Sequence, residues 1–143
     1  MPYQYLDDIA TADVAFRAWG QTEEEMLISA CEAAVGVMVE DLETIAPGER
    51  RSLSLGGKTL EDLLFRLLGE LIYLKDTERL LLRVTRVKIS AGKGGLSLSA
   101  DTFGERLDPE KHRPQVDIKA VTLHQFQVKK IQRKWQATVV LDI

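Results

Sequence analysis

The sequence predicts a single α+β domain over residues 1–143, with two amphipathic helices packed on one face of a mostly antiparallel β-sheet. Two observations predict this fold. Two stretches repeat apolar residues at intervals of three and four, which is the helical period. Several other stretches alternate apolar and polar residues and are separated by turn residues, which is typical of antiparallel strands. A chain of 143 residues is long enough for one domain with a substantial core.

The first residues predict two strands. A short strand carries Tyr3 and Tyr5 on one face, and an acidic turn follows it. Residues 14–19 then alternate in polarity and form the second strand. Asp13 lies at the start of this strand, on the face opposite Val14.

The first helix opens at Thr22, whose hydroxyl accepts from the first turn while Glu25 reaches back to the amide of Thr22. We expect this helix to end near Asp41. Its apolar stripe consists of Leu27, Ala30, Cys31, Ala34 and Met38. We interpret Cys31, the one cysteine of the chain, as a buried small hydrophobe without reactivity.

The second helix opens at Thr59, with Asp62 in the capping-box position, and we expect it to end near Lys75. A short strand over residues 51–55 precedes it. The helix has a strongly apolar stripe made of Leu60, Leu63, Leu64, Leu67, Leu68 and Leu71. A leucine stripe of this kind predicts a core helix.

From Arg79 onward the pattern has a period of two, but its phase changes near Thr85, which predicts a β-bulge. The glycine-rich residues 91–95 predict a hairpin turn into a returning strand. Residues 104–117 predict one long loop, either functional or a solvated crossover. Strands over 118–128 and 135–143, joined by a tight turn, complete the chain.

The last strand stays apolar up to the final residue, which predicts a terminus tied into a sheet. One face carries Trp135, Ala137, Val139, Leu141 and Ile143, and Asp142 points to the other face. The free carboxylate of Ile143 lies one residue from the Asp142 side chain. Two interpretations stay open: an edge strand with a solvated aspartate, or a cation site that needs another carboxylate. A sheet is the element that can bring Asp13 next to Asp142.

Composition limits the function classes. The formal net charge of −3 argues against stable direct binding to nucleic acid. We interpret the basic residues of the C-terminal half as sheet-edge charges rather than an RNA track: Arg83, Arg86, Lys88, Lys129, Lys130, Arg133 and Lys134. No apolar run approaches the ~20 residues of a membrane span, and no signal peptide is recognisable, so we expect a cytoplasmic protein without a membrane partner.

No motif in the sequence indicates an enzyme. There is no nucleophile elbow, and His112 and His124 are not at a spacing typical of zinc ligands. A lone histidine of this kind is more often a hydrogen-bonded structural group than a ligand.

Six motifs follow one another along nearly the whole chain: Thr11-Ala-Asp-Val14 with Arg17-Ala-Trp-Gly20, the helix opening at 22–25, the stretch 63–73, the loop 104–112, the stretch 118–124 and the closing Val140-Leu-Asp-Ile143. In this order and register they resemble the archease family. The resemblance implies a small α+β protein that is not an enzyme. It implies that the protein assists a GTP-dependent RNA-splicing ligase of the RtcB type, promoting its guanylylation and multiple turnover.

The resemblance also implies a divalent cation, Ca²⁺ with Mg²⁺ or Mn²⁺ as alternatives, held by Asp13, Asp142 and the terminal carboxylate of Ile143. Converging carboxylates repel one another, and a hard cation relieves that repulsion. Lys119 matches a strand lysine of the family, which we place at the ligase surface or beside the acidic cluster. Ala10 stands where the family usually has histidine, which predicts a weaker cation site or a divergent partner.

Two other functions stay open. One is a chaperone-like binding module for another RNA-modifying enzyme, such as a methyltransferase. The other is a metal-dependent hydrolase, which we disfavour because no general base or nucleophile is evident beyond the carboxylates themselves. The sequence leaves the native metal, the oligomeric state and the docking surface on a ligase undetermined.

Overall fold

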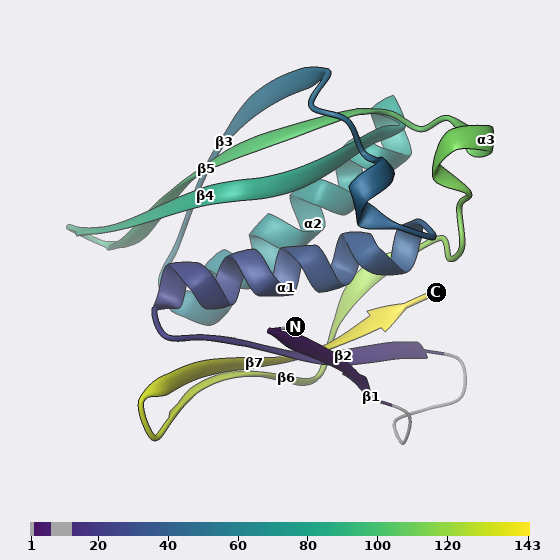
Figure 1. Ribbon diagram of the computed structural model, residues 1–143. Coiled ribbons are helices and arrows are strands. Elements are labelled where there is room, and N and C mark those ends of the chain that lie inside the picture. Colours follow the sequence, from purple (N-terminus) through teal and green to yellow (C-terminus); the bar gives the residue numbers. More distant parts are fainter. Residues whose placement is uncertain (1, 7–12) are drawn as a thin grey trace.

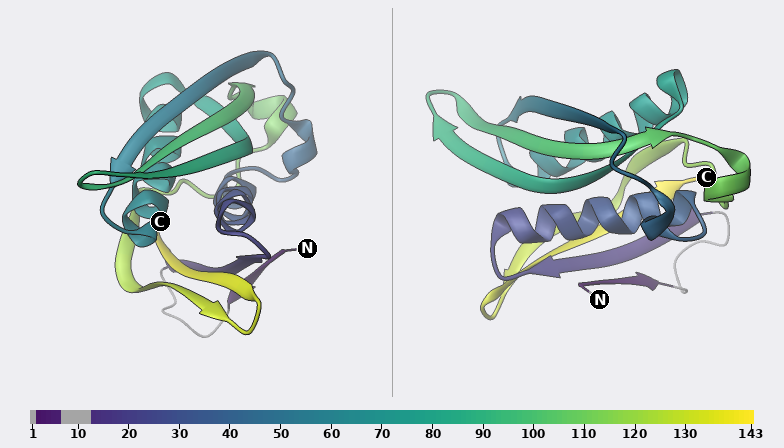
Figure 2. Two further views of the ribbon diagram at one scale, coloured as in Figure 1. Left: turned by 90° about the vertical axis from the view of Figure 1, so that its left-hand side faces the viewer. Right: turned by 45° about the horizontal axis from the view of Figure 1, so that its top comes forward.

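The computed structural model, which describes residues 2–6 and 13–143, places two long helices between two antiparallel sheets (Figure 1 and the left panel of Figure 2). In order, the first sheet contains β1 (Tyr3–Leu6), β2 (Asp13–Gly20), β7 (Lys134–Asp142) and β6 (Ala120–Ile131). The second contains β3 (Glu49–Gly57), β5 (Gly95–Arg106) and β4 (Leu80–Gly92). The helices are α1 (Glu23–Met38), η1 (Leu42–Thr44), α2 (Leu60–Glu78) and α3 (Pro109–His112).

The α+β class is confirmed, but the expectation of one sheet with helices on one face is wrong. Helix α1 contacts both β2 of the first sheet and β4 of the second, and α2 contacts β6 as well as β3 and β4. Each helix therefore needs two apolar faces. In α1, Ala33 and Val37 lie outside the predicted stripe and are nevertheless buried. A helix that is apolar on most of its circumference is one that is covered from both sides.

The predicted helix starts are confirmed, while the ends shift by three residues. Thr22 accepts from the Glu25 amide at 3.1 Å, but Glu25 accepts from the amide of Gln21 rather than that of Thr22. Helix α1 ends at Met38, three residues before the expected end. In α2, Thr59 and Asp62 form the predicted capping box, and the helix runs on to Glu78.

The second sheet confirms the predicted bulge and hairpin. The β4–β5 register shifts between Val84 and Arg86, so Thr85 is the extra residue. Gly92 and Gly95 are opposed at the turn, and Gly94 has a φ of 90°, a conformation that glycine adopts without strain. In α1, Cys31 is fully buried and burial raises the pKa of its thiol, as expected of a structural cysteine.

Half of the predicted long loop is regular secondary structure. Strand β5 continues to Arg106, and α3 follows it. Beyond α3, the Gln115 amide donates to the Met38 carbonyl at 3.0 Å, and Pro114 is bridged to Val39. This segment is therefore fastened to the end of α1 before it enters β6. None of the helices in the described ranges is long and apolar enough to cross a membrane.

Candidate functional site

The first sheet brings the two predicted aspartates together. Asp13 at the start of β2 is directly opposite Asp142 at the end of β7. Side chains of directly opposed residues project from the same face of an antiparallel pair, with Cβ atoms about 4.5–5.5 Å apart. The chain's C-terminus lies at this same edge of the sheet, beside the start of β2 (Figure 1).

Burial of apolar side chains in the core fixes the register that pairs Asp13 with Asp142. Val14 is opposite Leu141 and Phe16 is opposite Val139, and all of these except half-buried Val14 are fully buried. A slip of one residue would turn the whole apolar row of β2 away from the helices. The register that buries Phe16 therefore also opposes Asp13 to Asp142 on the other face.

A third strand borders the acidic pair. Ala120 of β6 is opposite Asp142, and the Lys119 amide donates to the Asp142 carbonyl at 2.8 Å. The Lys119 side chain is exposed, and none of the ion pairs among the described residues involves its ammonium group. The structure thus brings the backbone of Lys119, rather than its charge, to Asp142.

Ile143 anchors the chain end. Its side chain is partly buried and packs against the core, although it is the last residue. The carboxylate of Ile143 is covalently next to Asp142, so this anchoring keeps it at the same edge of the sheet. The carboxylates of Asp13, Asp142 and Ile143 thus lie at one end of β2 and β7, the two central strands of the first sheet, and we call this end the acidic edge.

These groups are of the kind that a hard cation takes as ligands. Ca²⁺ takes six to eight oxygen ligands, which carboxylates, backbone carbonyls and water provide. Within the part of the chain that the structure describes, no three side chains of His, Cys, Asp or Glu are grouped as metal ligands. Asp13 and Asp142 would therefore be the side-chain donors, and the Ile143 carboxylate a third. Ala10, where the family resemblance led us to expect histidine, lies outside the described residues.

Lys75, near the end of α2, holds the strand that borders the acidic pair. Its ammonium group donates to the Ile118 carbonyl at 3.0 Å and to the Asp117 carboxylate at 2.5 Å, and it also pairs with Asp76. Its side chain is buried, with 9% of its surface exposed. The hydrogen bond from Lys75 lowers the pKa of Asp117. Lys75 fixes the residue immediately before Lys119.

We did not identify Lys75 as a site residue from the sequence. A signal was present, because position 75 follows Leu68 and Leu71 at helical spacing and so continues the buried stripe of α2. A lysine in such a stripe must find acceptors, since a buried unpaired charge is very costly. Here the acceptors come from the segment that enters β6.

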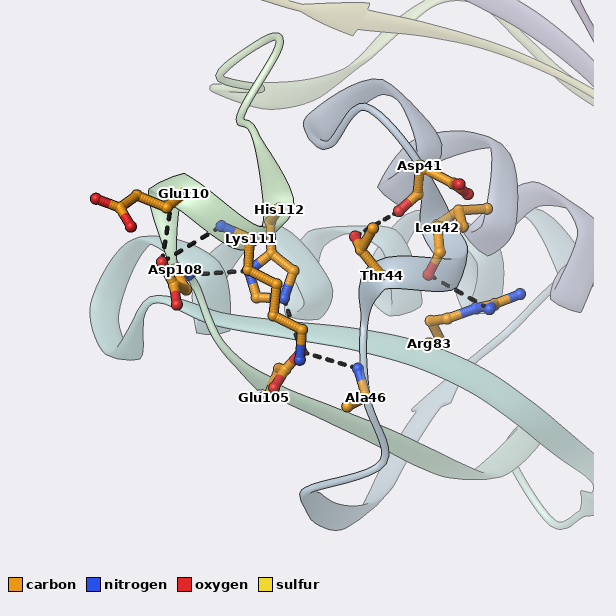
Figure 3. Close-up of polar contacts among 10 residues, drawn as sticks. All are labelled: Asp41, Leu42, Thr44, Ala46, Arg83, Glu105, Asp108, Glu110, Lys111 and His112. Carbon is orange, nitrogen blue, oxygen red and sulfur yellow. Dashed lines mark hydrogen bonds and ion pairs between the residues drawn. The ribbon is translucent and has the colours of Figure 1, made fainter.

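A second polar cluster fastens α3 and the end of β5 (Figure 3). Glu105 accepts from the Ala46 amide at 2.8 Å, pairs with Lys111 at 2.7 Å and accepts from His112 Nε2 at 2.8 Å. The fully buried His112 accepts from the Asp108 amide at Nδ1, which assigns the ring proton to Nε2. His112 is therefore a structural group, as the sequence suggested.

The hydrogen bonds keep Glu105 ionised. Burial opposes ionisation, but hydrogen bonds from the Ala46 amide, Lys111 and His112 outweigh it and lower the pKa of Glu105 to about 2. This cluster joins the segment before β3 to the segment after β5. It supports the path of the chain toward β6 and does not reach the acidic edge.

Comparison with known proteins connects this chain to one family. The model of the Archease protein family (MTH1598/TM1083) matches residues 3–143. The protein archease of Pyrococcus abyssi is 37% identical over 134 residues, which cover 93% of this chain and 94% of that protein. The protein archease of Methanosarcina barkeri is 37% identical over 142 residues, covering 99% of this chain and 95% of that one.

Solved structures agree with this result. The solution structure of Methanobacterium thermoautotrophicum protein 1598 superimposes with a TM-score of 0.86 at 30% identity, and the match covers 99% of both chains. The crystal structure of a Thermotoga maritima archease, described as a possible chaperone, gives a TM-score of 0.65 at 21% identity over 96% of this chain and 97% of that one. The latter shares the fold.

Proposed function

The chain belongs to the archease family, and we propose that it is a non-catalytic cofactor protein that activates a GTP-dependent RNA-splicing ligase of the RtcB type. It promotes guanylylation of the ligase and allows the ligase to turn over repeatedly. The observation that carries this proposal is the direct opposition of Asp13 and Asp142 beside the terminal carboxylate.

We further propose that this acidic edge binds a divalent cation, with Ca²⁺ first and Mg²⁺ or Mn²⁺ as alternatives. The donors fit such an ion, because all of them are carboxylate oxygens and two are held together by strand pairing. Asp13, Asp142 and the Ile143 carboxylate would hold the ion. A bound divalent cation would supply positive charge for contact with phosphate oxygens.

The acidic edge is accessible to a partner protein. Asp142 is exposed and lies at the end of its strand, so a partner can reach it without any rearrangement of the core. We propose that this edge enters the nucleotide site of the ligase. Phosphoryl-type transfer depends mainly on positioning and charge stabilisation, so a rigid, correctly placed acidic edge can accelerate it without a nucleophile of its own. Exposed Lys119 beside it is available to contact the ligase.

The test is RNA ligation with limiting ligase, with and without this protein. We expect the native protein to raise product from about one turnover per ligase to many. Asp13→Asn and Asp142→Asn, which keep side-chain shape, should each abolish most of this gain. Asp101→Asn is the matched control, because Asp101 is an exposed strand aspartate of the other sheet, and it should activate fully.

Full activation by both site variants would refute the role of the acidic edge. Absence of activation by the native protein, with a cognate ligase, would favour the alternative of a chaperone-like module for another RNA-modifying enzyme such as a methyltransferase. Product formed by the isolated protein from RNA would instead contradict the non-catalytic role.

A further inference from the structure

The charge of this protein is segregated along the sequence. Residues 118–141 contain five lysines and arginines and no aspartate or glutamate. Because the whole chain carries a formal charge of −3, the remainder carries −8. A single net charge averages these two parts and conceals a strongly basic segment.

The structure concentrates most of this charge at one tip. Strands β6 and β7 form a hairpin that projects from the first sheet at the end opposite the C-terminus (Figure 1). Ile131 and Lys134 are opposed at its turn. Four exposed cations lie within six residues, and among the described residues none of them takes part in an ion pair: Lys129, Lys130, Arg133 and Lys134. We call these four residues the basic tip.

Protection of a sheet edge explains only part of the basic tip. Lysines on an edge strand prevent pairing with other chains, and Lys129 and Lys130 are on the edge strand β6. Lys134, however, is on β7, which lies between β2 and β6, and Arg133 is in the turn. Lys134 lies beyond Trp135, the last residue of β7 that pairs with β2, and Arg133 belongs to no strand, so edge protection leaves at least Arg133 unexplained.

Aromatic residues accompany the cations on both faces of the hairpin. The Lys130 ammonium lies 5.8 Å from the centre of the Trp135 ring, a cation–π contact that fixes its position. On the other face, Gln136 is opposed both to Lys129 on one side and to Trp19 on the other. Lys134 projects from this same face, diagonal to Lys129. Cations and amide groups contact the phosphates of nucleic acids, and aromatic rings such as indoles stack on unpaired bases.

We propose that the basic tip is a docking surface for the phosphate backbone of RNA. The occupant must be a polyanion, because four unpaired cations in so small an area repel one another and a row of phosphates compensates them. The choice of RNA over another polyanion rests on the proposed function, in which the partner enzyme joins RNA. This departs from the expectation, drawn from the net charge, that the protein does not bind nucleic acid stably.

The test is fluorescence anisotropy of a labelled single-stranded RNA with the isolated protein, without ligase, over a range of salt concentrations. Neutralising about four phosphates gives a slope of log K against log salt of about −3 for a single strand. We expect the native protein to show this slope and the variant K129Q/K130Q/R133Q/K134Q to lose at least tenfold in affinity at low salt, with a slope near zero. Circular dichroism of each variant verifies folding.

The matched control is R50Q/K58Q/K88Q/K93Q, which removes four exposed cations at the second sheet and changes the net charge equally. It should retain the affinity and slope of the native protein. An equal loss of RNA affinity in both variants, or no RNA binding by the native protein at low salt, would each overturn the proposal.

The outcome is independent of the ligase assay. If the protein activates the ligase but does not bind RNA, only the proposal that the basic tip binds RNA is overturned. Failure of Asp13→Asn and Asp142→Asn to impair activation, with salt-sensitive RNA binding intact, would refute the acidic edge and leave the tip as an RNA-binding surface.

Discussion

Replacing Asp142 by asparagine should have opposite effects on stability with and without a divalent cation. Asp142 and Asp13 are directly opposed like charges, and the terminal carboxylate adds a third. Two unit charges about 5 Å apart repel by about 0.8 kcal/mol in a water-like dielectric, and salt reduces this. Asp142→Asn should therefore raise the free energy of unfolding of the metal-free protein by about 0.5 kcal/mol.

Bound Ca²⁺ should reverse this order of stability between the native protein and Asp142→Asn. A ligand present at about 100 times its Kd stabilises the folded state by about 2.7 kcal/mol. For a domain of 143 residues, 1 kcal/mol corresponds to about 3 °C in Tm, so Ca²⁺ should raise the Tm of the native protein by about 8 °C. Asp142→Asn removes a proposed ligand and should lose most of that rise. The variant is then the more stable protein in chelator and the less stable one in Ca²⁺.

The assay is thermal unfolding followed by circular dichroism, in chelator and in a series of Ca²⁺ concentrations. Asp13→Asn should behave as Asp142→Asn does, because the two carboxylates are equivalent in the pair. Asp101→Asn, on the other sheet, should leave both Tm values unchanged within about 1–2 °C. A lower Tm in chelator together with an undiminished rise in Ca²⁺, in both site variants, would refute the idea that these carboxylates repel each other and share an ion.

Two further predictions concern the groups that support the site. Because hydrogen bonds depress the pKa of Glu105 to about 2, below its ordinary 4.5, its contribution to stability is full above about pH 4.5 and is lost as pH falls toward 2. Glu105→Gln should therefore cost about 1–2 kcal/mol in urea unfolding at pH 7, allowing for water screening, and roughly half of that near pH 3; an equal cost at both values would contradict it. Lys75→Met leaves the Ile118 carbonyl without its donor and should cost about 1–3 kcal/mol, against under about 0.5 kcal/mol for the exposed control Lys58→Met. Equal costs for the two lysines would show that the buried contacts of Lys75 do not matter.

The features predictable from sequence were those decided by neighbours in the chain. The cap at Thr59 and the bulge at Thr85 each depend on residues within a few positions, and both are confirmed. The arrangement of layers depends on distant contacts instead. Burial of Ala33 and Val37 needs β4 on the far side of α1, and small apolar residues around a helix do not say how many sheets cover it.

The residues of the site divide in the same way, into those predictable from chain neighbours and those set by distant contacts. The face that carries Asp13 followed from alternation within its own strand, and the partner strand had to be inferred from the unusual apolar terminus. Lys75 was missed because its acceptors lie more than 40 positions away in the chain. The cations of the basic tip were recognised from the sequence as a locally basic set, but their gathering at one end of the sheet depends on the pairing of β6 with β7.

Strand β7 connects the acidic edge to the basic tip. It begins with Lys134 at the tip and ends with Asp142 at the edge, so the two poles are about 26 Å apart at the rise of an extended strand. Charge changes separated by that distance, and sharing no partner, are expected to act additively. Substitutions at the tip should then leave the Ca²⁺ response intact, and substitutions at the edge should leave RNA affinity intact. A variant with both sets should lose both responses, as expected if β7 separates two independent binding surfaces at opposite ends of one sheet.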